Sequence, residues 1–499
     1  LNRLRLYPKN LSGNSERDNM ETTHFISQST ALILVITISL IFTILGLYHS
    51  RKFQGINNYL TANRNINFFS LTTSLVASAL GAWILFGPAS AATWGGIGAV
   101  IGYALGTAFP MIFLIYLGKK LRKEFPKGST LIEFLRKKFG KSLFKLILLM
   151  MIFYMFIFLC AEVTAVAILI NYISGTQLWI TAVIILLATL TYTLYGGLRA
   201  SIFTDNIQMV VIGILLIISA VYLLNFNENE FSFSFVNDKN PHLLSSSYIP
   251  SYTAGLTFFI AVAATNLFHQ GNWQRVYAAK DYQTLRKSLI VSFFVIIPIV
   301  FFMGFSGLVA VSSNPNVVPD LGFFSLLLKE QTELLSLVIV TLGLALTIST
   351  VDTLVNAISS LIIVDGKATF NLDKKTNYLN LSKLIIIVLS IIAFVIASKG
   401  FSVLYLFLLA DLFCCAFVVT VFYSFYNKQI NEKTAYISII VGLIGGFLLF
   451  PAPDFSKSIL VGILLPKEIF SQFISQSLLF LSFVLATFLP LVIIKIKKF

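Results

Sequence analysis

Charged residues are scarce in this chain of 499 residues. Asp, Glu, Lys and Arg together make up 11% of the sequence, whereas 57% of the residues are hydrophobic. Ordinary soluble domains contain about 25% charged residues, which cover much of their exterior. A soluble globular protein is therefore excluded, because too little polar surface remains to cover so large an apolar interior. The sequence predicts an all-α integral membrane protein whose apolar exterior has the lipid bilayer as its partner.

Cysteine and histidine are also rare, with three and four residues respectively. Cys160, Cys414 and Cys415 all lie inside apolar runs, and no spacing resembles a zinc site. We find no pairing of a nucleophile with a base of the kind that enzymes use. The sequence therefore predicts a protein that is not an enzyme and that has no organic cofactor.

The formal net charge of +15 does not indicate nucleic-acid binding. The basic residues lie in short clusters between apolar runs, which is typical of membrane topology and not of a phosphate-binding face. When the first connecting loop is placed in the cytoplasm, most of the 36 Lys and Arg residues fall on that side. We therefore expect an N-terminus outside and a C-terminus in the cytoplasm.

Apolar runs long enough to cross a bilayer recur along the chain, and we expect about thirteen transmembrane helices. Residues 1–29 are predicted to be a polar tail, in which Met20 is a candidate for the native start, and residues 30–499 a single transmembrane domain. The expected spans are 30–48, 69–87, 96–117, 144–171, 177–195, 202–224, 252–272, 289–312, 336–363, 384–398, 401–425, 434–451 and 472–494.

The stretch SLTTSLVASALGAWILFGPASAATW, residues 70–94, is rich in small residues and is expected to break at Gly87-Pro88, near its outer end. One interpretation is a face that lets neighbouring helices approach closely. The other is a discontinuous helix whose freed carbonyl groups face a cavity and bind an ion.

The stretch YGGLRASIFTDNIQ, residues 195–208, places Asp205 about one turn inside a spanning helix. Gly196-Gly197 predicts a tight turn at the inner end of the preceding helix. A carboxylate at such depth is costly unless it is paired or hydrated, so Asp205 indicates an ion pathway. The alternative is that Asp205, next to Thr204, caps the start of the helix.

The stretch LTISTVDTLVNAISSLIIVD, residues 346–365, places hydroxyl groups and Asp352 within an apolar span. Ser349, Asp352, Thr353 and Asn356 share one helical face. Hydroxyl and carboxylate oxygens are ligands that a hard cation such as sodium prefers, so we place Asp352 in the ion pathway with Asp205. The alternative for the hydroxyl groups is hydrogen bonding between helices.

These three stretches, together with NLFHQGNWQRVYAAKD at residues 266–281, resemble the sodium:solute symporter family. The resemblance covers nearly the whole chain, and YGGLRASIFTDNIQ is its most specific part. It implies the leucine-transporter fold, in which one leading helix precedes two inverted repeats of five helices and two trailing helices follow. It also implies a sodium site built from the backbone carbonyls of Ala77, Leu80 and Leu346 and the hydroxyl groups of Ser349 and Thr350.

The same resemblance implies a solute site between the first and sixth core helices. Our candidate residues there are Trp83, Phe86, Asn266, His269 and Gln270. Aromatic faces with a few amide groups suit a small neutral or zwitterionic solute. Proline carriers of the family have an aspartate where this chain has Ala79, which is evidence against proline. Two further acidic residues lie deep in expected spans and are candidate supporting or gating groups, namely Glu162 and Asp411.

The expected function is sodium-coupled import of a small polar solute, such as an amino acid or urea, by alternating access. Sodium is then a transported partner. The alternatives are a proton-coupled solute symporter and a membrane solute sensor that acts through a separate output protein. We expect the chain in the cell membrane, and the family resemblance favours a bacterial inner membrane.

Overall fold

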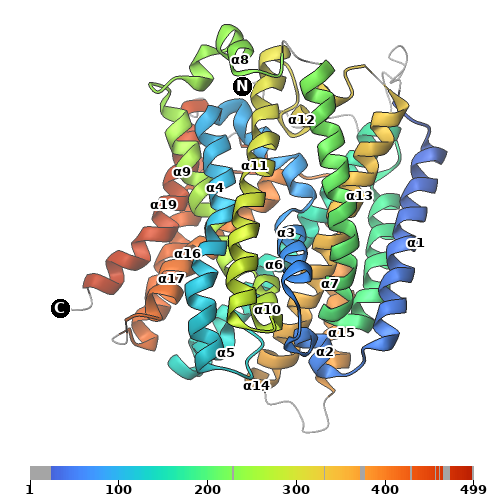
Figure 1. The fold of residues 1–499 in the computed structure, drawn as a ribbon. Helices are drawn as coiled ribbons and strands as arrows, with labels where there is room; N and C mark the ends of the chain where they lie inside the picture. Colours follow the sequence, from blue (N-terminus) through green and yellow to red (C-terminus); the bar gives the residue numbers. More distant parts are fainter. Residues whose placement is uncertain are drawn as a thin grey trace.

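The computed structural model describes residues 24–226, 230–330, 332–370, 377–427, 430–455, 457–459, 461–464 and 472–496, and it is a bundle of helices (Figure 1). The described residues form two isolated β-bridges, Ile66 with Ala279 and Pro451 with Ser458, and no strand. Most of the expected N-terminal tail, residues 1–23, lies outside the described residues.

The long helices run in chain order as α1 Gln28–Lys52, α3 Phe68–Ala79, α4 Gly87–Glu124, α6 Lys141–Ser174, α7 Leu178–Phe226, α9 Ile249–Phe268, α11 Tyr282–Ser313, α13 Glu333–Ser360, α15 Tyr378–Ala397, α16 Val403–Ser424, α17 Glu432–Leu449 and α19 Gln472–Ile496. The short ones are α2 Ile56–Thr61, η3 Ala62–Arg64, η4 Ala82–Leu85, α5 Ile132–Lys138, α8 Phe233–Lys239, η5 Pro241–Leu244, α10 Gln270–Ala278, η6 Pro319–Leu321, α12 Gly322–Leu327, η7 Leu361–Gly366, α14 Lys367–Phe370 and α18 Val461–Leu464.

Within the described part of the chain, eleven helices are long and apolar enough to cross a membrane. This count is two lower than the thirteen spans that we expected, and the difference arises at two places in the chain. The helix α3 has only 12 residues and is too short by itself. The helix α7 contains two expected spans, because two helices meet there at a kink at Gly197, where φ is 60° and ψ is −153°.

The break that we expected at Gly87-Pro88 lies elsewhere. Pro88 stands in the first turn of α4, where the missing N–H of proline costs no helical hydrogen bond. The chain leaves the helical conformation at Leu80 and Gly81, between α3 and η4. Helical structure then resumes in η4 and continues to Gly96, whose φ of 59° and ψ of −158° turn the chain back into the rest of α4.

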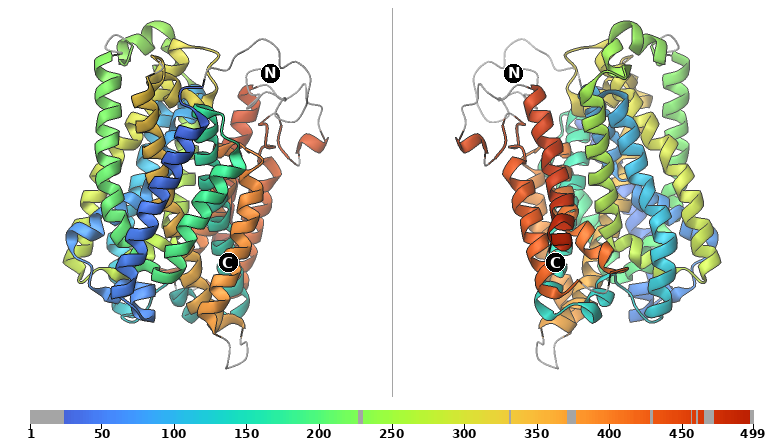
Figure 2. Two further views of the ribbon diagram at one scale, coloured as in Figure 1. Left: turned by 90° about the vertical axis from the view of Figure 1, so that its right-hand side faces the viewer. Right: turned by 90° about the vertical axis from the view of Figure 1, so that its left-hand side faces the viewer.

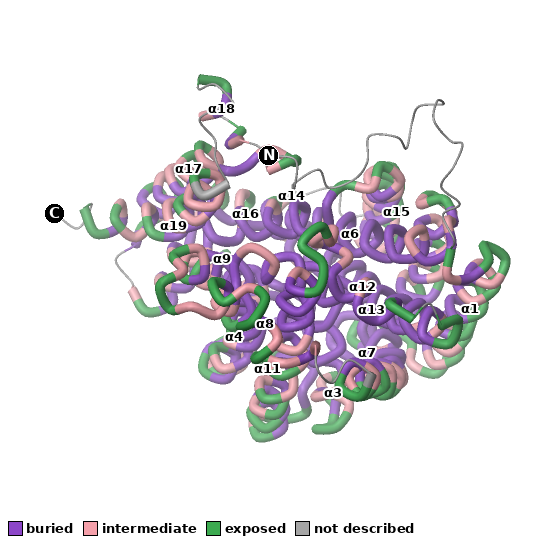
Figure 3. The backbone as a smooth tube through the Cα atoms, turned by 90° about the horizontal axis from the view of Figure 1, so that it is seen from above, coloured by how far each residue is buried: buried purple, intermediate pink, exposed green. Residues whose placement is uncertain are grey.

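The helix α13 lies at the centre of the bundle. All of its residues from Ala345 to Ser360 are buried, and it contacts α3, α6, α7 and α10. Seen from above, the buried residues occupy the middle of the molecule and the exposed ones its rim (Figure 3). The late helices α17 and α19 pack against each other and against α16 at one side (Figure 2). Polar residues of α13 are therefore shielded from lipid by neighbouring helices.

The two ends of the bundle differ in the short helices that they carry. One end, which we call the α2–α5 end, carries α2, α5 and α14 (Figure 1). The opposite end, the α8–α12 end, carries α8 and α12. The basic cluster at residues 119–145 surrounds α5 and so belongs to the α2–α5 end.

Candidate sodium and solute sites

The unwound segment between α3 and η4 frees backbone carbonyl groups inside the protein. The last helical bond runs from the Leu80 N–H to the Val76 carbonyl, and the next backbone bond runs from the Ile84 N–H to the Gly81 carbonyl. The Ala82 N–H donates instead to Oε2 of Glu162 on α6, at 2.9 Å. In this way Glu162 satisfies a donor at the break, while the carbonyls of residues 77–80 are left free of helical pairing.

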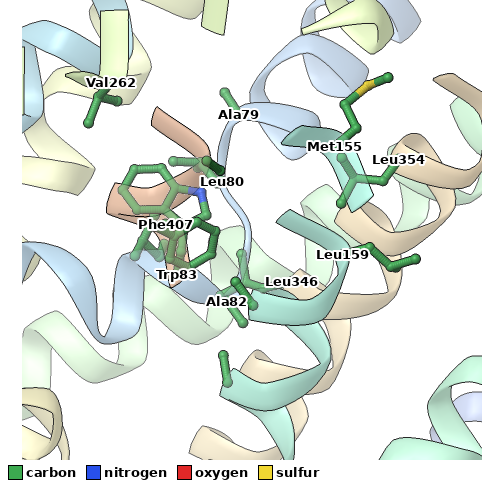
Figure 4. Close-up of a cluster of buried hydrophobic side chains, with 14 of the residues drawn as sticks. Ala79, Leu80, Ala82, Trp83, Met155, Leu159, Val262, Leu346, Leu354 and Phe407 are labelled. Atoms are coloured by element: carbon green, nitrogen blue, oxygen red, sulfur yellow. The ribbon is translucent and has the colours of Figure 1, made fainter. Parts of the chain in front are cut away.

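The candidate sodium ligands lie on two segments that contact each other. Ala77 and Leu80 belong to the break in α3, and Leu346, Ser349 and Thr350 belong to α13, which packs against both α3 and η4. All five residues are buried. In Figure 4 the backbone is extended between Ala79 and Ala82, and Leu346 lies beside Ala82.

The oxygen atoms of this group suit a hard cation. The Thr350 hydroxyl donates to the Leu346 carbonyl at 3.1 Å, and the Ser349 hydroxyl donates to Oδ1 of Asp205 at 2.6 Å. Both hydroxyl oxygens therefore keep lone pairs that can face a cation. Carbonyl and hydroxyl oxygens without sulfur or imidazole favour an alkali ion over a transition metal.

Asp205 forms a fully buried ion pair that the sequence did not indicate. Its Oδ2 accepts a hydrogen bond from Nη2 of Arg275 at 2.7 Å, and both side chains have no exposed surface. The Ser74 hydroxyl donates to the same oxygen at 2.6 Å. In the sequence, Arg275 stands in the polar stretch NLFHQGNWQRVYAAKD, whose charge pattern does not reveal burial. In the structure it lies in α10 and donates to Thr353 of α13 at 2.9 Å.

Asp352, also on α13, has hydroxyl groups as partners. Tyr192 donates to its Oδ2 at 2.6 Å, Ser201 donates to its Oδ1 at 2.8 Å and Thr204 donates to its Oδ2 at 3.2 Å. Thr204 and Asp205 thus share a turn of α7 but contact different parts of α13. Asp205 and Asp352, our two candidates for the ion pathway, belong to one polar network, because Thr353 accepts a hydrogen bond from Arg275 and donates to Oδ1 of Asp352 at 3.3 Å.

A cavity beside the break contains three of the five candidate solute residues. Trp83, Asn266 and His269 line it, together with Ser78, Ala79, Tyr103, Phe158, Val262, Thr265, Phe407 and Asp411. Phe86 and Gln270 do not line it. The Phe86 ring packs edge-on against Phe324 at 5.1 Å, towards the α8–α12 end.

Gln270 is turned towards the α2–α5 end of the bundle. Its Nε2 donates to the Ser129 carbonyl at 3.0 Å and to the Ser360 hydroxyl at 3.2 Å. A helix assignment from sequence does not settle such directions, because the break at His269 between α9 and α10 reorients every later side chain.

Aromatic rings form much of the cavity wall. Trp83 and Tyr103 stack with their centroids 5.5 Å apart, and Phe158 packs edge-on against Phe407 at 4.6 Å. Trp83 also meets Phe407 at 6.5 Å, and these two rings lie side by side in Figure 4. The carboxylate of Asp411 from α16 also lines the cavity. The sequence shows that Asp411 lies deep in an apolar run, but it does not place this residue at the solute site.

Comparison with known proteins identifies the family and the fold. The model of the family described as "Sodium:solute symporter family" matches residues 59–442. A spermidine transporter of Candida albicans is 27% identical over 381 residues, which cover 76% of this chain and 71% of the relative. A sodium/glucose cotransporter of Vibrio parahaemolyticus is 26% identical over 329 residues, 60% of this chain and 58% of the relative.

Solved structures agree in fold. A Na+-coupled sialic acid symporter, in a substrate-bound outward-open state, aligns with a TM-score of 0.69 and 19% identity over 92% of this chain and 97% of its own. A nucleobase-cation-symport-1 family transporter aligns with a TM-score of 0.54 and 12% identity over 89% and 96% of the two chains. The matched stretch contains the broken α3, the Asp205–Arg275 pair and the hydroxyl-bearing α13. The chain therefore belongs to the sodium:solute symporter family, as a multi-pass membrane transporter and not an enzyme.

Proposed function

We propose that this chain imports a small polar solute together with sodium. The observation that supports this most directly is the contact between the unwound segment of α3 and the hydroxyl groups of α13. The unwound segment, with its free carbonyl groups, packs against α13, which carries the buried Ser349 and Thr350, and Ser78 and Ala79 beside the break line the solute cavity. One ion bound at this contact would hold both segments and shape the cavity wall that Ser78 and Ala79 supply.

The proposed coupling follows from the position of the ion. A cation that joins α3 to α13 favours the conformation in which these helices are closest, and that conformation also forms the solute cavity. Entry of sodium is driven by its concentration gradient and by the membrane potential, which contributes about 2.3 kcal/mol per charge per 100 mV. Movement of one group of helices relative to the other would then expose both sites to the opposite side.

The orientation remains part of the proposal. We place the chain in the cell membrane with its α2–α5 end in the cytoplasm, because the basic cluster at residues 119–145 belongs to that end. The N-terminus is then outside. The α8–α12 end would face the source of the solute.

The names of the related proteins do not point to a single solute. Their names include spermidine, glucose and sialic acid, which differ in charge and in polar groups. The proposal therefore rests on the ion site, and the choice of solute depends on the cavity residues of this chain.

The test is uptake of a panel of labelled solutes into proteoliposomes, with and without an inward sodium gradient. We expect accumulation that requires sodium in the wild type. The double variant Ser349→Ala/Thr350→Ala should need at least about ten times more sodium for half-maximal uptake, which corresponds to about 1.4 kcal/mol.

A matched control is Thr341→Ala, which removes a hydroxyl from the same helix. Thr341 donates to the Leu337 carbonyl at 2.7 Å, as Thr350 does to Leu346, but lies more than two turns away. It should keep its sodium dependence. Accumulation that follows a pH gradient and ignores sodium would contradict the proposal and favour proton coupling. Binding of a solute without accumulation under either gradient would favour a sensor.

A further inference from the structure

The solute cavity contains a carboxylate that has no cationic partner within the described residues. Asp411 is 4% exposed, and its Oδ1 accepts a hydrogen bond from the Thr265 hydroxyl at 2.5 Å. Neither the Arg275–Asp205 pair nor the Lys329–Glu230 pair involves Asp411. A buried carboxylate inside a membrane is costly unless a positive charge or several donors approach it.

We propose that the transported solute carries a positively charged nitrogen, which binds between Asp411 and the aromatic rings of this cavity. The inference rests on the proposed function, because it names the solute class of the same site. It revises our expectation of a neutral or zwitterionic solute. An organic cation supplies the missing positive charge each time the cavity is occupied.

The ring arrangement suits such a cation. Trp83, Tyr103, Phe158 and Phe407 come from four different helical segments and face one cavity. The negative face of an aromatic ring attracts an ammonium group within about 6 Å of the ring centre, most strongly for tryptophan. A carboxylate at one wall and π faces at the others together favour an amine or quaternary ammonium group.

The same cavity offers few free hydrogen-bond partners for a neutral polyol. Of its polar groups, the Ser78 hydroxyl donates to the Leu75 carbonyl, the Asn266 amide donates to the Val262 carbonyl and the Thr265 hydroxyl donates to Asp411. These three donors are therefore satisfied within the protein, and Nδ1 of His269 is a lining atom without a partner among the described residues. A sugar needs several free partners for its hydroxyl groups. Among the described lining residues there is no Lys or Arg to pair with an anion.

A second acidic cavity lies towards the α8–α12 end. Asp320 lines it with Trp94 and Phe455, and the Ser402 hydroxyl donates to Oδ2 of Asp320 at 3.4 Å. Oδ1 of this buried residue has no hydrogen-bond partner among the described residues.

Aromatic rings connect the two cavities. Phe258 contacts Trp94 at 5.8 Å and Tyr103 at 4.7 Å, and Tyr103 stacks on Trp83. Asp320 therefore lies at the cavity nearer the α8–α12 end, the end that we propose faces the source of the solute. A carboxylate there raises the local concentration of cations.

The test uses pairs of compounds that have the same shape and differ in charge. The pairs are choline with 3,3-dimethyl-1-butanol, butylamine with 1-butanol, and 1,4-diaminobutane with 1,4-butanediol. The thermal unfolding temperature of the purified full chain in detergent is measured with each compound in sodium buffer. We expect at least one cation to raise this temperature while its neutral counterpart does not. Equal shifts within every pair, a shift with neutral members alone, or no shift with any cation would overturn the inference.

The variant Asp411→Asn keeps the size of the side chain and removes its charge. We expect its affinity for the stabilising cation to fall at least ten-fold. The control Glu230→Gln removes a carboxylate from an exposed ion pair and should leave the affinity unchanged. If Asp411→Asn does not fold, Phe407→Leu keeps the carboxylate and removes one ring, and it should weaken binding of the cation several-fold. Unchanged affinity in whichever of these variants folds would overturn the assignment.

Uptake measurements separate this inference from the proposed function. A cation that binds and enters vesicles without any need for sodium contradicts sodium coupling and leaves the solute class intact. A neutral solute that accumulates with sodium, while the cations neither bind nor compete, contradicts the solute class and leaves sodium symport intact.

Discussion

The buried ion pair between Arg275 and Asp205 leads to a quantitative prediction. Both side chains have no exposed surface, and their N–O distance is 2.7 Å. Asp205→Asn keeps the hydrogen-bonding shape at this position but leaves the Arg275 charge without its counter-ion. Removal of one partner from a buried pair costs about 3–5 kcal/mol, because the remaining charge is still desolvated.

A second ion pair in the same chain serves as the matched control. Lys329 and Glu230 lie 2.8 Å apart, but their side chains are 51% and 31% exposed. Exposed pairs contribute about 0–1 kcal/mol, because water and salt screen the charges. Glu230→Gln should therefore cost less than about 1 kcal/mol, although the distance is almost the same.

The assay is unfolding of each variant by SDS titration in mixed micelles, in potassium buffer without sodium. A double-mutant cycle with Arg275→Gln isolates the interaction between the two side chains, which we expect to be about 2–3 kcal/mol. The reasoning would be refuted if Asp205→Asn and Glu230→Gln cost the same. Additive effects of Asp205→Asn and Arg275→Gln would also refute it, because they would show that the two charges do not stabilise each other.

Two further predictions concern the backbone at Gly197 and the carboxylate of Asp320. Gly197→Ala should destabilise the protein by about 2–5 kcal/mol, because φ is +60° and the new Cβ would lie 2.5 Å from the ring of Tyr59. Gly213→Ala in the same helix meets no atom within 4 Å, so unfolding assays should show an unchanged or slightly raised stability; equal losses at both glycines would contradict this. Burial raises the pKa of Asp320 above its ordinary 3.8. Wild type should therefore lose stability relative to Asp320→Asn as the pH rises above about 4, and a difference in melting temperature that does not vary with pH would contradict this.

The membrane class and most helix positions could be predicted from the sequence. Runs of apolar residues are a local property, and a helix that crosses lipid must satisfy its backbone groups within itself. The runs at 30–48, 252–272 and 384–398, for example, each fall within or largely overlap one helix, α1, α9 and α15 respectively. The hydroxyl groups of α13 and the depth of Asp205 and Asp352 were visible for the same reason, since polar residues stand out in an apolar run.

The position of the break in the first core helix could not be predicted in the same way. Gly87-Pro88 is the strongest local signal for a break, yet a proline in the first turn of a helix is well tolerated. The actual break at Leu80 and Gly81 depends on Glu162, which lies 80 residues away in sequence and accepts the Ala82 N–H. A local pattern does not contain this partner.

The sequence by itself determined that this is a helical membrane protein of the sodium:solute symporter family, with its polar residues concentrated in a few helices. Only the tertiary structure decided which of those residues meet. It paired Arg275 with Asp205, turned Gln270 away from the solute cavity and brought Asp411 into it. The physical reason is that apolar periodicity reports where each helix lies relative to lipid. The contacts that select an ion and a solute form between helices far apart in sequence, and their geometry depends on how the broken helices pack.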